Sequence, residues 1–453
     1  MTISGVPAPL ASPRPVLLAV SLCSFMTAFD TTALNVTLPA IGHAFSLGLA
    51  GLQWVAGAYT LMFAGLLLSA GALSDRFGAR RLFIVALLLF ILSSVACGLA
   101  ANSGQLIAFR AIQGMGAALM LPSSMALLTH AYPDRTARSR AVALWGGISA
   151  LALVAGPLLG GAFTEALGWR AIFFLNVPLC AIALGGCLLC HGPDAQPHRR
   201  LDWPGQLLSF LALLSLTFVL IEGATLGWAS PMSLGLLAMG LLLGTLFLKT
   251  QRRPAGAMLP LTLFSSRAFT ATVAAGFLQT LGYYGSLFLL PMLLQARGDA
   301  PLTIGWHMLP MTLVTGLLAT FSGRLSTRYG ARRVGMTGML GGALGALLLL
   351  SGLTPDMLVI GGVLLGMAGA TLPVIVTACL ASVPVERVGI GSGVLNAARQ
   401  CGGLAGIALL GALLQMPHHA PLALICVALA FALAAALMQC RLQDARQPSL
   451  SGR

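Results

Sequence analysis

The stretch Gly71-Ala72-Leu73-Ser74-Asp75-Arg76-Phe77-Gly78-Ala79-Arg80-Arg81 is a short basic segment between two long apolar runs. A near copy begins 252 positions later (323 minus 71), and eight of its eleven positions are identical. The copy reads Gly323-Arg324-Leu325-Ser326-Thr327-Arg328-Tyr329-Gly330-Ala331-Arg332-Arg333. A repeat at this distance predicts a chain built from two similar halves.

The composition of the chain is that of a membrane protein. Its 453 residues are 58% hydrophobic and only 8% charged, whereas a soluble domain carries about 25% charged residues. Apolar runs of about 20 residues recur along the chain, and each is long enough to cross the roughly 30 Å core of a bilayer as a helix. Helices are required there because the backbone has no water to bond to at that depth. The expected class is therefore an all-α, multi-pass membrane protein.

Fourteen apolar spans can be delimited in the sequence. They cover residues 16–38, 52–73, 82–101, 105–128, 140–163, 170–190, 204–222, 231–249, 268–295, 303–323, 333–352, 356–380, 389–414 and 420–440. An even number of spans places both termini on the same side of the membrane.

The basic residues indicate which side that is. With cytoplasmic termini, 21 of the 25 Lys and Arg residues lie in inner segments and only Arg170 and Arg297 in outer ones, while Arg110 and Arg399 lie inside spans. Because positive residues accumulate on the cytoplasmic side of membrane proteins, both termini are expected to be cytoplasmic. The same short clusters between spans argue against nucleic acid as the reason for the net charge of +14.

The repeated segment also determines the division into domains. Its first copy joins spans 2 and 3 and its second joins spans 10 and 11, so spans 1–6 correspond to spans 9–14 and spans 7 and 8 are an inserted pair. The expected domains are a first six-helix bundle over 1–193, the inserted helix pair over 194–257 and a second six-helix bundle over 258–453.

Four motifs in this chain resemble those of the major facilitator superfamily, in particular its fourteen-span drug:proton antiporters. The segment 71–81 resembles the signature loop between spans 2 and 3, and 106–116, which contains Arg110, resembles the motif of span 4. The run 155–161 is similar to the Gly-Pro motif of span 5, and 30–39 to the motif of span 1. The resemblance covers nearly the whole chain and implies two bundles that rock around a central site, giving alternating access.

The resemblance also implies a conformational switch. In the family, the acidic residue of the signature loop contacts a helix end in the opposite bundle and stabilises the outward-facing state, and the Gly-Pro pair shapes the seal between the bundles. The corresponding residues here are Gly71, Asp75, Arg76, Gly78, Arg80, Arg81, Gly156 and Pro157. The second copy of the loop has Thr327 in place of Asp75. The first copy is therefore expected to be the conformational latch, that is, the copy whose acidic residue stabilises the outward-facing state.

Asp30 is the acidic residue most clearly inside a span. A charge at that depth costs at least about 2.5–3.5 kcal/mol, so it should be paired, protonated or exposed to a wet cavity. At about 1.5 Å per residue, Asp30 lies roughly 21 Å from the inner start of span 1 and Arg110 roughly 8 Å from the outer end of span 4, so their depths are similar. We expect them to approach each other across the cavity of the first bundle and to couple proton binding to transport. A static ion pair between spans 1 and 4 is the alternative.

Other candidates for a substrate cavity are polar or aromatic residues inside spans. They are Trp54 and Tyr59 in span 2, Gln279, Tyr283 and Tyr284 in span 9, Asn396 and Arg399 in span 13, and Glu222 near the end of span 7. An aromatic lining suits a lipophilic cation, but packing or lipid contact explains aromatic residues equally well. Arg399 either faces a cavity or bonds to carbonyl groups, and Glu222 either contributes to function or reaches the outer interface.

Taken with the resemblance, these features predict a proton-driven exporter, an antiporter, for small lipophilic, cationic drugs or toxic compounds. The expected setting is the plasma (inner) membrane of a bacterium, where such a protein would act as a monomer in multidrug efflux and antibiotic resistance. Its partners would be the bilayer, a small-molecule substrate and protons, with no cofactor and no enzymatic activity. One rival is the same fold exporting a specific anionic metabolite recognised by Arg110 and Arg399, and a weaker one is a non-transporting membrane sensor or scaffold.

Overall fold

The computed structural model describes residues 13–189, 192–193, 195–196, 201–252, 258–384, 387–416 and 420–441. All regular secondary structure within these ranges is helical. Fourteen stretches of helix are long and apolar enough to cross a membrane, in agreement with the fourteen spans expected from the sequence. The all-α membrane fold is therefore confirmed.

The helices follow one another with short connections. The first six are α1 (Pro13–Phe45), α2 (Leu49–Phe77), α3 (Ala79–Gly98), α4 (Ser103–Ala131), α5 (Arg135–Leu167) and α6 (Ala171–Leu188). The next two are α7 (Trp203–Leu226) and α8 (Pro231–Thr250). The remaining elements are η1 (Leu261–Ser265), α9 (Arg267–Ala296), α10 (Pro301–Tyr329), α11 (Ala331–Leu348), η2 (Leu349–Ser351), α12 (Pro355–Gly369), α13 (Leu372–Ala381), α14 (Val388–Gln415) and α15 (Ala420–Arg441).

Acidic side chains begin two of these helices. The carboxylate of Asp134 accepts a hydrogen bond from the amide of Ala137 at the start of α5 (2.7 Å), and Asp202 accepts one from the amide of Gly205 at the start of α7 (2.9 Å). These caps satisfy amide groups that a helix leaves unpaired in its first turn. Two of the few acidic residues of the chain therefore have a local structural role.

One expected span is interrupted. The sequence predicts a continuous helix over 356–380, whereas the structure has a break between α12 and α13 at Ala370 and Thr371. Pro373 follows in the first turn of α13, where it lacks an amide hydrogen and its ring opposes the carbonyl of Gly369. The two helices still cross as one span, Pro355–Ala381.

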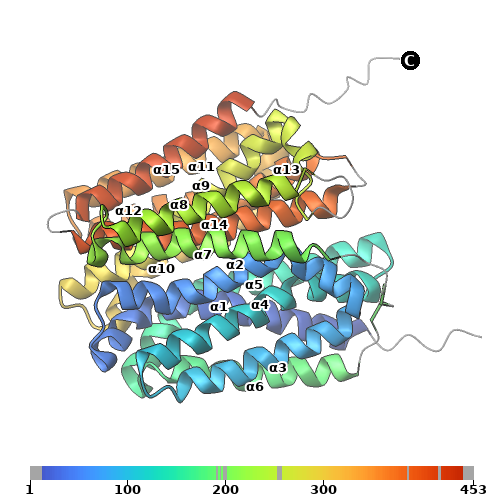
Figure 1. Cartoon of the computed structure of the whole chain (residues 1–453), viewed down its shortest axis with the longest axis horizontal. Helices are drawn as coiled ribbons and strands as arrows, with labels where there is room; N and C mark the ends of the chain where they lie inside the picture. Colours follow the sequence, from blue (N-terminus) through green and yellow to red (C-terminus); the bar gives the residue numbers. More distant parts are fainter. Residues whose placement is uncertain are drawn as a thin grey trace, which may run out of the picture.

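The helices form two bundles that lie side by side (Figure 1). In the first bundle α1 packs against α5 and α6, and α4 packs against α2 and α3. In the second, α9 packs against α14 and α15, and α11 packs against α12 and α15. Each bundle has its own core of buried apolar side chains. The expected domain boundaries at 193/194 and 257/258 fall beside residues outside the described ranges, and they stay a prediction.

The inserted pair attaches through α7. This helix packs against α2 of the first bundle and α14 of the second, so it lies along the boundary between the two bundles (Figure 1). α8 packs on α7, and its buried residues are only Ser233 and Gly240. Its outer face carries exposed leucines such as Leu234, Leu241 and Leu242. A face of this kind suits contact with lipid.

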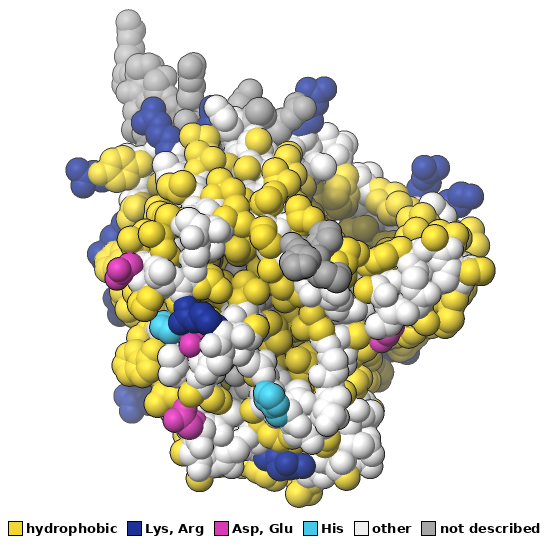
Figure 2. Space-filling view, turned by 90° about the vertical axis from the view of Figure 1, so that its left-hand side faces the viewer, with side chains coloured by type: hydrophobic (Ala, Val, Ile, Leu, Met, Phe, Trp, Pro, Cys, Tyr) yellow, Lys and Arg dark blue, Asp and Glu magenta, His cyan; other side chains and the backbone are white. Residues whose placement is uncertain are grey.

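The two ends of the molecule differ in charge. α1 begins and α15 ends at the same end, on the right in Figure 1, and the turns from α2 to α3 and from α10 to α11 lie there too. We call this the basic end, because both copies of the repeated arginine-rich segment belong to it. Figure 2 views the opposite end: apolar side chains cover most of the face, and Lys and Arg appear mainly around its rim.

Both copies of the repeated segment turn at a glycine with the same backbone conformation. Gly78 has φ 87° and ψ 129°, and Gly330 has φ 86° and ψ 138°. Residues with a Cβ are strained at positive φ, by about 1–3 kcal/mol in rarely populated regions. We therefore expect Gly78→Ala to lower the thermal midpoint of the purified protein in detergent. Gly146→Ala is the control, because a Cβ there meets nothing within 4 Å; equal midpoints for the two variants would contradict this expectation.

Candidate functional site

A buried carboxylate lies inside the first bundle. Asp30 belongs to α1, and its Oδ2 lies 2.6 Å from Nη1 of Arg110 in α4. Its other oxygen, Oδ1, accepts hydrogen bonds from the side-chain amides of Gln113 in α4 and Asn176 in α6, each at 3.2 Å. One cation and two amides thus hold the carboxylate, which is the compensation that a buried charge requires.

The partner, Arg110, is also enclosed by groups of the first bundle. Its Nη1 donates to Oε1 of Gln113 (2.6 Å) as well as to Asp30, and its Nε donates to the carbonyl of Val55 in α2 (3.3 Å). The guanidinium carbon lies 4.5 Å from the ring centroid of Tyr59, within range of a cation–π contact. The ion pair therefore connects α1, α2 and α4.

The structure brings Asp30 and Arg110 together, but not across the cavity. Neither side chain is among the residues that line the cavity described next, because α1 and α4 pack directly against each other around the pair. Tyr59 connects the two sites, since it lines the cavity and stacks on the arginine. A static ion pair and a proton-coupling pair both fit this contact, so the coupling role stays a prediction.

A large cavity, about 1480 Å³ in volume, lies between the two bundles. Residues of α1, α2, α4 and α5 form one wall, and α14 forms most of the other. The lining extends from Tyr59 to Asp75 and His130, which lie close to the ends of α2 and α4. The cavity therefore reaches toward the basic end of the molecule.

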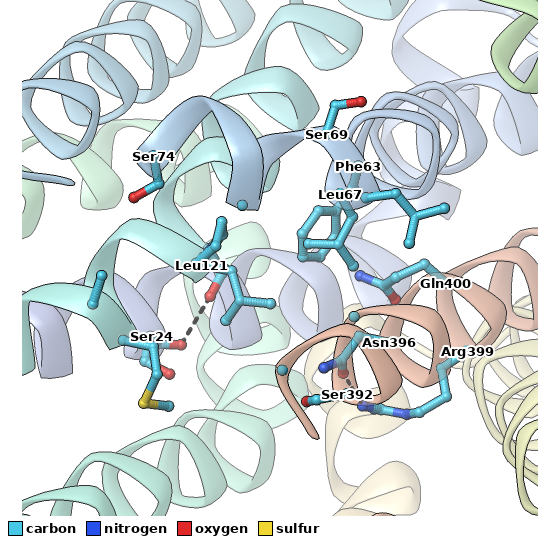
Figure 3. Close-up of a pocket in the computed structure, with 18 of the residues that line it drawn as sticks. Ser24, Phe63, Leu67, Ser69, Ser74, Leu121, Ser392, Asn396, Arg399 and Gln400 are labelled. Carbon is cyan, nitrogen blue, oxygen red and sulfur yellow. Dashed lines mark hydrogen bonds between the residues drawn. The ribbon is translucent and has the colours of Figure 1, made fainter. Parts of the chain in front are cut away.

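The two walls of the cavity differ in chemistry. In Figure 3, Phe63 and Leu67 of α2 present apolar groups, whereas α14 presents Asn396, Arg399 and Gln400. Nη1 of Arg399 donates to Oδ1 of Asn396 at 2.9 Å. Its Nε is buried and has no hydrogen-bond partner among the described residues.

Hydroxyl groups add polarity to the first-bundle wall. They come from Ser24, Thr27, Thr31, Thr60 and Ser149. The Ser24 and Ser149 hydroxyls are hydrogen-bonded to each other, which joins α1 to α5 at the edge of the cavity (Figure 3). The result is a mixed surface, apolar with scattered hydroxyls, which is the usual composition of a small-molecule site.

Four residues that the sequence predicted for the cavity line it in the structure: Tyr59 of α2, Tyr284 of α9, and Asn396 and Arg399 of α14. On α14, the lining positions from 389 to 407 recur every three or four residues, so they share one face of the helix.

Four other candidates are not among the lining residues and pack between helices instead. The indole of Trp54 in α2 donates to Glu222 in α7 (2.8 Å), and the amide of Gln279 donates to the carbonyl of Ala368 within the second bundle (3.3 Å). Tyr283 is buried in the core of that bundle. For Trp54, Gln279 and Tyr283 the predicted place in the cavity is corrected, because each side chain points toward a neighbouring helix. The sequence left Glu222 open between a functional role and the outer interface, and in this structure it is bonded to Trp54.

Direct contacts between the bundles seal the cavity at the end away from the basic end. A Cβ at Gly161 of α5 would lie 2.5 Å from the carbonyl oxygen of Pro301, and one at Gly305 of α10 would lie 2.5 Å from that of Pro157. Such an approach requires glycine on both helices. We call this α5–α10 contact the seal.

A polar contact closes the other side of the same end. The amide nitrogen of Gln53 in α2 donates to the carbonyls of Ile407 (3.1 Å) and Ala408 (2.7 Å) in α14. The amide nitrogen of Gln415 donates in turn to Oε1 of Gln53 (2.8 Å). One cavity open toward the basic end and closed at the other is one of the two states that alternating access requires.

Comparison with known proteins settles the family. The model of the Major Facilitator Superfamily matches residues 20–274 and 272–452, in the two halves of the chain. The chain belongs to the major facilitator superfamily. It is a multi-pass membrane transporter and not an enzyme.

Several relatives of this major facilitator protein are named as resistance proteins. The methylenomycin A resistance protein of Bacillus subtilis is 34% identical over 407 residues, which are 88% of this chain and 87% of that protein. The multidrug resistance protein Stp of Mycobacterium tuberculosis is 35% identical over 406 residues, 88% of this chain and 75% of that protein. The crystal structure of the peptide transporter POT in complex with sulfate has a TM-score of 0.72 at 15% identity, covering 94% of this chain and 93% of that chain. The last likeness shows the shared fold.

The signature loop of this major facilitator protein is tied to its own bundle. Nε of Arg80 donates to the carbonyl of Cys187 (3.3 Å), and its Nη2 donates to that of Leu188 (2.8 Å), at the end of α6. A cation is favourable there because the last carbonyls of a helix carry partial negative charge. The guanidinium of Arg76 lies 5.7 Å from the ring centroid of Phe77.

The other predicted switch residues lie at the cavity or the seal. Gly71 and Asp75 line the cavity near the basic end, and Asp75 is exposed there. Arg81 is exposed in the first turn of α3. The contact that the family implies for Asp75 stays a prediction. Of the Gly-Pro pair, Gly156 packs on α1 and the carbonyl of Pro157 faces the seal.

Sequence reasoning missed two partners of the buried ion pair. Gln113 follows Arg110 by three residues, which places both on one face of α4. Asn176 is the lone amide in the apolar helix α6. Polar residues are costly within a membrane, so either one was a detectable signal.

Proposed function

We propose that this transporter is a proton-coupled exporter of small lipophilic compounds, seated in a bacterial plasma membrane with both termini in the cytoplasm. The observation that carries the proposal is the buried Asp30–Arg110 pair, which lies directly behind the cavity wall. The arginine stacks on Tyr59, and Tyr59 lines the cavity. Ionisable residues inside membrane spans are costly, and those that are present mark substrate pathways or proton relays. A proton on Asp30 would remove the counter-charge of Arg110 and so change the packing of α1, α2 and α4.

The end at which the cavity is open supports a direction of transport. With the basic end in the cytoplasm, as the distribution of Lys and Arg favours, the cavity faces inward. A compound would enter from the cytoplasm, the seal would open, and the other end would close behind it. Proton binding from the outside would return the protein to the inward-facing state. Exchange of one species for the other in this order is antiport.

The nature of the relatives supports drugs as substrates. Two of them are named for resistance to methylenomycin A or to several drugs. The apolar wall of the cavity, with its scattered hydroxyls, suits lipophilic compounds of several shapes. The sequence predicted cationic substrates, but a second candidate, export of an anionic compound, is favoured by one observation: Arg399 lies on the cavity wall.

Uptake into everted membrane vesicles tests the proposal. We would use three probes that share a diethylaminocoumarin body: its carboxylic acid, the ethyl ester of that acid, and its dimethylaminoethyl amide. They are anionic, neutral and cationic respectively. We expect at least one to accumulate when a proton gradient is imposed, and accumulation to stop when a protonophore is added. Accumulation of a probe that the protonophore leaves unchanged would contradict proton coupling.

Asp75 is proposed to act in the conformational cycle rather than in binding. It is exposed on the cavity wall near the cytoplasmic end, and closing of that end would bring the helix ends of the second bundle toward it. We expect Asp75→Asn to lower kcat for probe uptake several-fold, about 0.3–1 kcal/mol per lost anion–helix contact, and to change KM little. Asp356→Asn, a change of the same kind at an exposed residue of α12, is the control. A variant with unaltered kcat would rule out the latch.

A further inference from the structure

The charges around the cavity are unbalanced at mid-membrane depth. Asp75, His130 and Asp202 line it close to helix ends. Arg399 lies 11 residues along α14 from Val388 (399 minus 388), which is roughly 17 Å at 1.5 Å per residue. Among the described lining residues it is therefore the one charged group deep inside.

The other deep charges cancel each other. Asp30 and Arg110 form a closed pair behind the wall, at 2.6 Å. Arg399 has no such counter-ion among the described residues: its Nη1 donates to the neutral amide oxygen of Asn396, and its Nε is left without a partner. A buried donor on an unpaired cation is costly, and an incoming acceptor with negative charge would relieve it.

Neutral polar groups surround this cation on the same wall. Ser392, Asn396 and Gln400 come from the same face of α14, and Tyr284 comes from α9. Figure 3 shows Gln400 of α14 on the side nearest to Leu67 of α2, and Arg399 extending toward Asn396, to which it is hydrogen-bonded. One side of the space is thus suited to an acidic group and the opposite side to an apolar body.

We propose that Arg399 is the substrate-selecting residue of the cavity and that the preferred substrates are small lipophilic carboxylic acids, bound as anions. The carboxylate would accept hydrogen bonds from Nε and Nη2 of Arg399, a geometry that the planar guanidinium matches with two donors. The apolar body would lie against Phe63 and Leu67. This inference rests on the proposed function as an exporter, and it replaces the expectation of a cationic substrate.

Export of an anion also fits the energetics of the proposed cycle. A bacterial membrane is negative inside, so an anion leaving the cytoplasm and a proton entering move charge in the same favourable direction. A cation that leaves the cytoplasm would move against the membrane potential. A fixed positive charge in the inward-facing cavity therefore selects the class of compound that the membrane potential helps to expel.

Binding of the three coumarin probes to the purified full-length protein in detergent, followed by fluorescence anisotropy, tests the subsite. Because hydrogen bonds to a charged group are stronger than neutral ones, we expect the acid to bind about tenfold or more tightly than its ethyl ester, and the cationic amide to bind most weakly. Arg399→Gln should remove the preference for the acid and leave the affinity for the ester unchanged. Arg399→Lys should restore part of it, since the charge returns without the two-donor geometry.

Arg140→Gln is the matched control, because it removes an exposed arginine at the cytoplasmic end of α5; it should leave all three affinities as in the wild type. The proposal is overturned if the acid binds no more tightly than the ester, or if Arg399→Gln weakens all three probes equally, which is the result of a purely structural role. The vesicle assay separates this from the exporter claim. Proton-driven uptake of the ester without preference for the acid would refute the subsite alone, whereas selective binding of the acid without proton-dependent uptake of any probe would refute the exporter alone.

Discussion

Asp30→Asn is expected to reduce proton-driven probe uptake to the level of vesicles without the transporter. The amide cannot take up and release a proton, and it removes the only carboxylate within reach of Arg110 in the described structure. Exchange of labelled for unlabelled probe across the membrane, which needs no net proton movement, should persist. The loss should therefore be specific to coupling, and both assays on the same vesicles measure it.

The variant also leaves a buried cation without its partner, a change that destabilises proteins by about 3–5 kcal/mol. The amount of protein in the membrane and its thermal midpoint must therefore be measured alongside transport. Asp30→Glu, which keeps a carboxylate, should recover part of the uptake, and Asp356→Asn, at an exposed position, should keep all of it. If Asp30→Asn vesicles still concentrate a probe against its gradient, Asp30 does not carry the proton.

Gly161→Val and Gly305→Val are expected to have the second-largest effect, because each would force the seal apart. A Cβ at either position would lie 2.5 Å from a backbone oxygen of the opposite helix, far inside contact distance. Overpacking of this kind costs about 1–3 kcal/mol. Because the contact joins the two bundles and not the core of either, the cost falls on the conformation in which the seal is closed, which corresponds to a population shift of about 5–150-fold.

Uptake rates should fall accordingly while the protein still folds. Spin labels on cysteines introduced at Glu165 and Leu302, whose carboxylate and amide are hydrogen-bonded across the seal at 3.1 Å, should report a longer distance in the Val variants than in the wild type. Gly235→Val on α8, where a Cβ meets nothing within 4 Å, should change neither rate nor distance. An unchanged distance in the Gly161 and Gly305 variants would show that the seal tolerates the added volume.

The sequence was sufficient to predict the spans because hydropathy along a membrane helix reflects the solvent it crosses. The two halves could be aligned through residues 71–81 and their copy. In agreement with this alignment, Gly78 and Gly330 have nearly the same φ angle. The similar depth of Asp30 and Arg110 was also predictable, since depth follows from counting residues along a helix of known rise.

The sequence did not predict which face of each helix points into the cavity. In a membrane protein the side of a helix that meets lipid is as apolar as the side that meets a neighbouring helix. Hydropathy therefore does not indicate which face of the helix points into the protein. Gln279 and Tyr283 lie on the right span but point into the second bundle, and Trp54 points to Glu222 on the inserted helix. Only the packing of the helices shows that these residues lie outside the cavity lining, whereas Tyr59 and Arg399 belong to it.

The inserted pair shows the same limit. Nothing in the residues of α7 indicated that it would pack against both α2 and α14, because contacts between distant segments depend on the arrangement of both bundles. Glu222 consequently looked like a candidate for the cavity or for the interface, and its bond to Trp54 decides its place in this conformation.

The most direct test of the central claim is whether movement of a substrate drives protons the other way. The purified protein would be placed in liposomes that enclose a pH-sensitive dye, with no pH gradient, and the coumarin probe that it transports fastest would be added outside. Coupled exchange predicts that the lumen becomes alkaline as the probe enters, with no such change in Asp30→Asn liposomes or in liposomes without protein. Probe entry through the wild-type protein without a pH change, or with acidification beyond that in protein-free liposomes, would contradict proton antiport.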